Sequence, residues 1–170
     1  MRSLYFLSVW LHILAAATWV GGMMALAFVV IPALRDPELQ PVRAKALHLM
    51  GLRLRVVGWV SLAVLLVTGL YNVAAHGFGL SDAFTGVLWK GAFGRTLAEK
   101  LSTFVVLVLL NAAHDFWVGP KVTALALRSG NPSAEGEKWR KAALWLGRLV
   151  FLLSLWMVAL GIMLVRGRPF

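Results

Sequence analysis

The chain contains no cysteine among its 170 residues. Disulfide bonds, thiolate metal centres, iron–sulfur clusters and covalently attached c-type haem all require cysteine, so the sequence excludes each of them. A metal ion or haem held by this chain would need histidine, methionine, asparagine or carboxylate side chains as its ligands.

Charged residues are also scarce, at 14% of the chain, whereas hydrophobic residues make up 60%. Soluble domains contain about 25% charged and about 45–50% apolar residues, so this composition indicates an integral membrane protein. The net charge of +10 does not point to nucleic acid, because the Lys and Arg residues lie mostly between the apolar runs. Orientation in the bilayer and contact with anionic lipid headgroups explain them better.

Four long apolar runs follow one another, at about residues 4–31, 54–76, 96–118 and 142–165. Each is long enough for a helix to cross a hydrocarbon core of roughly 30 Å. We therefore expect an all-α integral membrane protein, a four-transmembrane-helix bundle of up-down-up-down topology, with residues 1–170 forming a single transmembrane domain. The second helix is expected to begin before its apolar run, just after Pro41, and Pro32 and the polar segment 35–41 are together expected to end the first span.

The distribution of Lys and Arg predicts the orientation. Ten of these residues lie in or beside the first and third connections, and six lie near the opposite ends of the spans. The positive-inside rule then puts the first and third connections in the cytoplasm and both termini outside.

The four histidines fall near the two ends of the predicted spans. His12 interrupts the first apolar run, where a histidine that faces lipid is costly, so it should point into protein, a cofactor or water. His76 is expected at the outer end of the second span, His114 near the inner end of the third, and His48 in the inner, pre-membrane part of the second helix. This placement predicts two pairs, His12 with His76 outside and His48 with His114 inside.

Each predicted pair comes from two different helices, which is the arrangement that bis-histidine ligation of a b-type haem needs. The pattern therefore predicts one or two haem b groups and an electron path across the bilayer. Five neighbouring side chains are expected to orient the imidazoles or to pair with haem propionates: Asn72, Asn111, Asp115, Arg53 and Arg55.

Other readings of the same residues stay open. His48 and His76 also fit solvated histidines at the membrane interface, and the four histidines are equally able to bind copper. In a third reading the chain is a structural subunit of a membrane complex, and its histidines only satisfy local hydrogen bonds. The helical face of His12 continues through Ala15, Ala16, Trp19 and Met23. Small residues of the second span, such as Gly58 and Gly69, allow close helix contacts, and the oligomeric state stays open.

Two sequence stretches resemble a known family. The first span, LHILAAATWVGGMMALAFVVIPALR, resembles the opening helix of the copper-resistance D (CopD) family of bacterial inner-membrane proteins. The segment SLAVLLVTGLYNVAAH, followed by GRTLAEK, resembles the body of that domain. This resemblance covers most of the chain and implies copper movement across the bacterial inner (cytoplasmic) membrane.

The first span with His12, and the histidine late in the third span, are also similar to the HemJ group. Members of that group are small membrane proteins that bind b-type haem and oxidise protoporphyrinogen, which implies a redox site with His12 in a ligand position. Our leading interpretation is a membrane-embedded b-type haem protein, an oxidoreductase or a redox subunit of one. Membrane lipid, a quinone, a redox partner subunit or further copies of the chain are the expected partners, and nucleic acid is not.

Overall fold

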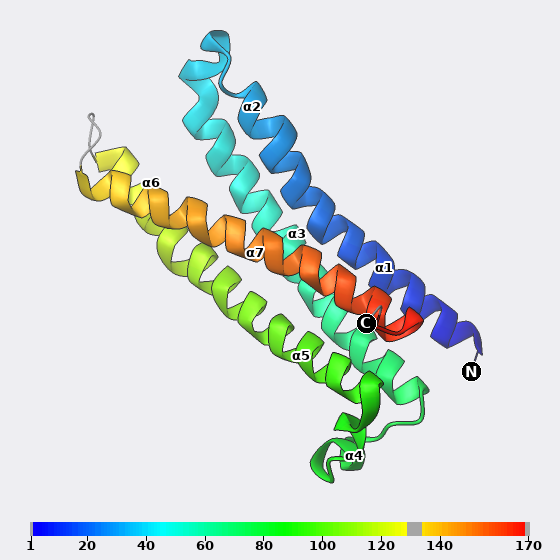
Figure 1. Ribbon diagram of the computed structural model, residues 1–170. Coiled ribbons are helices and arrows are strands. Elements are labelled where there is room, and N and C mark those ends of the chain that lie inside the picture. Colours follow the sequence, from blue (N-terminus) through cyan, green and yellow to red (C-terminus); the bar gives the residue numbers. More distant parts are fainter. Residues whose placement is uncertain (1, 129–133, 169–170) are drawn as a thin grey trace. The chain divides into compact units, whose positions relative to one another are not determined.

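The computed structural model describes residues 2–128 and 134–168, and nearly all of them are helical (Figure 1). Four helical stretches are long and apolar enough to cross a membrane: Arg2–Ala33, Pro37–Ala75, Gly91–Leu125 and Ala134–Arg166. The predicted all-α class with four membrane-spanning helices is therefore confirmed. The helices form two compact units, Met1–Leu88 and Trp89–Phe170, which we describe separately as the N-terminal and C-terminal units.

The N-terminal unit is a helical hairpin. Helix α1 (Arg2–Ala25) continues through a widened turn at Leu26–Val30 into the short α2 (Ile31–Ala33). After a tight turn at Pro37–Leu39, α3 (Gln40–Ala75) returns alongside α1, and the short α4 (Leu80–Phe84) follows it. The glycine-rich segment that follows α3, residues 76–86, thus contains one turn of helix, α4.

The ends of α3 follow from local sequence. Asp36 accepts a hydrogen bond from the backbone N–H of Glu38, at 2.9 Å, and so caps the turn before the helix. Pro41 lies in the first turn of α3, where no backbone N–H is needed. The helix ends at Ala75, and the chain turns away at Gly77, whose φ of +88° suits glycine. The expectation that this helix begins well before its apolar run is confirmed.

The C-terminal unit is a second hairpin, made of α5 (Gly91–Ala112), a widened turn at Ala113–Val118, α6 (Gly119–Arg128) and α7 (Ala134–Arg166). The helices extend beyond the predicted spans, and α7 begins at Ala134 rather than near residue 142. In the polar segment 128–138, residues 134–138 are therefore helical, and residues 129–133 lie outside the described residues.

Both widened turns have the wide, π-type hydrogen bonding and directly precede a proline. The first ends two residues before Pro32 and the second two residues before Pro120. Proline lacks an N–H, and its ring clashes with the carbonyl four residues earlier, so the helix widens there instead of keeping regular bonds. The helix ends at Ala33, between Pro32 and the polar segment 35–41, which were together expected to end the first span.

Small side chains make the contact between α1 and α3. The buried residues of the two helices are Ser8, Ala15, Gly58, Ser61, Leu62 and Thr68. Close backbone approach through small residues is how helices pack in membranes. Large apolar side chains point outward instead, as with Phe6 at 73% and Val67 at 67% exposure, which suits a lipid surround.

Candidate functional site

His12 is half-buried where α1 crosses α3, and its ring is held by Thr68. The Nδ1 atom of His12 lies 2.8 Å from Thr68 Oγ1. The Thr68 hydroxyl donates its single proton to the Val64 carbonyl at 2.6 Å, so it must accept the hydrogen bond from His12 Nδ1–H. In the neutral ring the lone pair is then on Nε2, which is the tautomer that binds metals through Nε2.

Residues on both sides of the ring fix its position. One turn before it on α1, Ser8 Oγ donates to the Thr68 carbonyl at 3.3 Å. On α3, a Cβ at Gly69 would lie 3.4 Å from His12 Cε1, so the ring packs close to the helix backbone. The close helix contact that Gly69 was expected to allow is made here, with the His12 ring of α1.

His76 lies on the same hairpin but at a different level. It is exposed at the end of α3, its Nδ1–H donates to the Asn72 carbonyl at 2.7 Å, and its ring meets Tyr5 edge-on at 5.9 Å between centroids. Tyr5 is seven residues before His12, and His76 is seven after Gly69. At 1.5 Å per residue the two imidazoles are about 10 Å apart along the hairpin. The structure therefore does not bring His12 and His76 to one iron atom.

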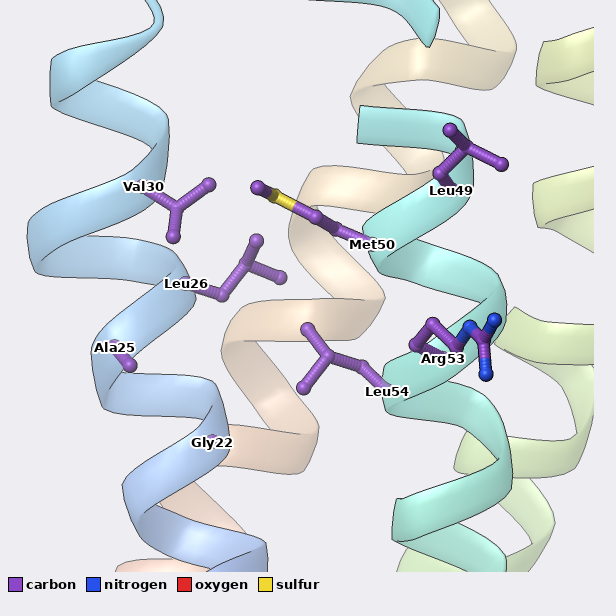
Figure 2. A pocket seen from close by; sticks show the side chains of 8 residues that line it. All are labelled: Gly22, Ala25, Leu26, Val30, Leu49, Met50, Arg53 and Leu54. Carbon is purple, nitrogen blue, oxygen red and sulfur yellow. The ribbon is translucent and has the colours of Figure 1, made fainter. Parts of the chain in front are cut away.

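The other predicted pair is divided between the units, with His48 on α3 and His114 in the C-terminal unit. His48 is exposed. Near it, α1 and α3 enclose an apolar groove of about 380 Å³, where Leu26 and Val30 face Met50 (Figure 2). The Arg53 guanidinium, predicted to pair with a propionate, is turned away from these apolar side chains (Figure 2), and Arg55 is half-buried.

His114 and Asp115 are brought together by the widened turn before Pro120. The Nδ1 atom of His114 lies 3.0 Å from Asp115 Oδ1, and Asn111 donates to the other carboxylate oxygen at 3.3 Å. The three residues predicted around the third span therefore form one hydrogen-bonded group. A carboxylate on Nδ1 fixes the orientation of the ring.

The structure contains one cluster of charged and polar side chains that was not predicted from the sequence. In the structure Glu99 binds Arg168 at 2.5 Å, and Arg168 also donates to Thr96 at 2.9 Å. The Lys100 ammonium lies 3.2 Å from where a Cβ of Gly161 would be. Gly167 follows α7 with a φ of +85° and turns the chain back toward α5. This glycine is the sequence feature that could have indicated the contacts of Arg168 with α5.

No cluster of three or more His, Asp or Glu side chains able to hold a metal ion occurs within residues 2–128 and 134–168. Among the described residues, three imidazoles are held through Nδ1: His12 and His76 in the N-terminal unit and His114 in the C-terminal unit.

Comparison with known proteins gives two matches. A family model described as "Domain of unknown function (DUF4149)" matches residues 14–131. An uncharacterized protein of Aquifex aeolicus (strain VF5) is 36% identical over 162 residues, which cover 95% of each chain. No solved structure matches the chain.

Proposed function

The chain belongs to this DUF4149 family, whose description assigns no activity, and we propose that this member is a membrane-embedded b-type haem protein that transfers electrons, with His12 as a residue that would hold the haem. The observation that carries the proposal is the Thr68 hydroxyl, which accepts from His12 Nδ1–H and leaves Nε2 as the ligating atom. Histidines that ligate metals almost always donate their other ring N–H in this way.

The chain's own residues have definite tasks in this proposal. Thr68 fixes the tautomer of His12, and Gly69 lets the ring approach α3 closely. His12 lies within a spanning helix, where a histidine is costly unless it points into protein or a bound group. A bound haem would supply one-electron redox chemistry that no side chain of this cysteine-free protein provides.

His114 is the corresponding residue of the C-terminal unit. Its partner is a carboxylate, Asp115, which is a stronger acceptor than a hydroxyl. We therefore include His114 in the proposal as the ligand of a second haem, separate from the haem at His12. His76 and His48 are not needed by it, because both are exposed and His76 lies at a different level from His12.

A reduced-minus-oxidised visible spectrum of the purified protein, with iron and copper analysis of the same sample, tests the proposal. We expect a haem b spectrum that is weakened by His12→Ala. Thr68→Val keeps the size of the side chain but removes the acceptor, and it should lower haem affinity about 10- to 100-fold. His48→Ala is the matched control and should leave the spectrum unchanged.

The same sample distinguishes the alternatives. Copper bound stoichiometrically without haem would refute the haem proposal and favour the copper-handling role that the CopD resemblance implies. Neither metal, after expression with ample haem and copper, would favour a structural subunit. In the proposed role the protein resides in the bacterial inner membrane, with both termini outside, and exchanges electrons with a quinone or a redox subunit.

A further inference from the structure

A line of polar side chains runs along the contact between α1 and α3, from the end of the hairpin to His12. Tyr5, Ser8 and His12 lie on successive turns of α1, and Thr68, Asn72 and His76 lie on successive turns of α3. Direct contacts join the two helices: the Tyr5 ring meets His76, and both Ser8 and His12 donate to Thr68. We call these six residues the polar track.

Polar groups inside a membrane span are costly unless they form hydrogen bonds between helices. Ser8 and His12 form such bonds with Thr68. At one end of the track His76 is exposed, and at the other end His12 is half-buried within the span. The track therefore leads from the surface of the hairpin inward to the imidazole of His12.

Asn72 lies midway along the track and carries an unsatisfied atom. Its side-chain Oδ1 is buried and has no hydrogen-bond donor among the described residues. Asn72 is one turn, about 6 Å, from both Thr68 and His76 along α3. A buried carbonyl oxygen without a donor is destabilising, and buried waters typically satisfy such atoms when other polar groups are near.

We propose that a water molecule bound at Asn72 Oδ1 completes the polar track and brings water from the aqueous phase at the His76 end of the hairpin to the His12 ring. The chemistry required of the ligand is only that it donates to one oxygen and bonds to neighbouring polar groups, which water does. The proposal goes beyond the proposed function, because it concerns the hydration of the His12 ring. The hydration of the track itself does not depend on haem.

Deuterium exchange at the Cε1–H of each histidine, measured by mass spectrometry after proteolysis of the protein in D₂O, tests the track. This slow exchange needs water or hydroxide at the ring, and it reports the four histidines separately. We expect His12 to exchange although it lies inside a spanning helix. Asn72→Leu should slow its exchange about fivefold, the equivalent of one net hydrogen bond to the lost water, and should leave exposed His48 unchanged.

Ser61→Ala is the matched control. Ser61 is buried on the same helix, but it lies seven residues from Thr68 on the side away from His76, and its hydroxyl donates only to the Val57 carbonyl. It should leave His12 exchange unchanged. A variant that unfolds would expose His12 and speed its exchange, so misfolding gives the opposite sign.

The proposal is overturned by no exchange at His12 in the unaltered protein, or by equal exchange at His12 in Asn72→Leu and the unaltered protein. An equal slowing by Ser61→Ala would also overturn it, because it would show a general packing effect. Since the measurement uses haem-free protein as well as any haem-loaded form, a failed haem spectrum and a failed track are separate outcomes.

Discussion

The contact between Gly58 and Trp19 makes a quantitative prediction about the hairpin that positions His12. A Cβ at Gly58 would lie 2.7 Å from Trp19 Cζ3, and no rotation of a short, flexible chain can relieve it, because the neighbour is an indole ring. Overpacking of this kind costs about 1–3 kcal/mol. Alanine in place of glycine in a helix interior gains about 0.5–1 kcal/mol. Gly58→Ala should therefore be neutral to about 2.5 kcal/mol destabilising.

Gly51→Ala is the control that isolates the clash. Gly51 is on the same helix, and a Cβ there would meet nothing within 4 Å, so only the helix-propensity gain applies. We expect Gly58→Ala to be about 1–3 kcal/mol less stable than Gly51→Ala.

Unfolding by sodium dodecyl sulfate in mixed micelles, followed by circular dichroism, measures this difference. Adding Trp19→Leu to Gly58→Ala should recover part of the loss, because the smaller side chain leaves room for the methyl group. If Gly58→Ala proved as stable as Gly51→Ala, the close approach of α1 and α3, and with it the described position of His12, would be refuted.

Two further predictions concern the C-terminal unit. Asp115→Ala should reduce the fraction of His114 that carries its proton on Nδ1, since the carboxylate acceptor at 3.0 Å is lost; nitrogen NMR of ¹⁵N-histidine-labelled protein measures this fraction, and an unchanged spectrum would contradict the contact. Glu99→Gln should destabilise the protein by less than about 1 kcal/mol, because its ion pair with Arg168 is more than one-third exposed. The loss should shrink further in high salt, and a loss that grows with salt would count against an electrostatic origin.

The absence of cysteine and the lengths of the apolar runs determined the class of protein by themselves. Crossing a bilayer depends on the summed hydropathy of one segment, which is a property of the sequence alone. For the same reason the depth of His12 in the first span could be read directly, and His114 with Asp115 and Asn111 could be grouped because they are close in sequence.

The ends of the helices were less predictable, since hydropathy indicates which residues lie in the hydrocarbon core of the membrane and not where a helix begins or ends. α7 begins at Ala134, before its apolar run, because Glu135 and Glu137 in its first turn suit a helix N-terminus in water. The effect of proline was also hard to predict. Pro32 and Pro120 each follow a widened turn and do not end the helix, because the backbone hydrogen bonds of the preceding turn take the wider, π-type pattern.

Only the tertiary structure decided which atoms meet between helices. The sequence placed His12 and His76 on the same side of the membrane, but the register of α1 against α3 puts them about 10 Å apart. That register depends on contacts such as Gly58 with Trp19 and Gly69 with His12, and these join residues 39 and 57 positions apart. Periodicity along one helix contains no information about such a pairing, so the bond between His12 and Thr68 had to come from the packed hairpin.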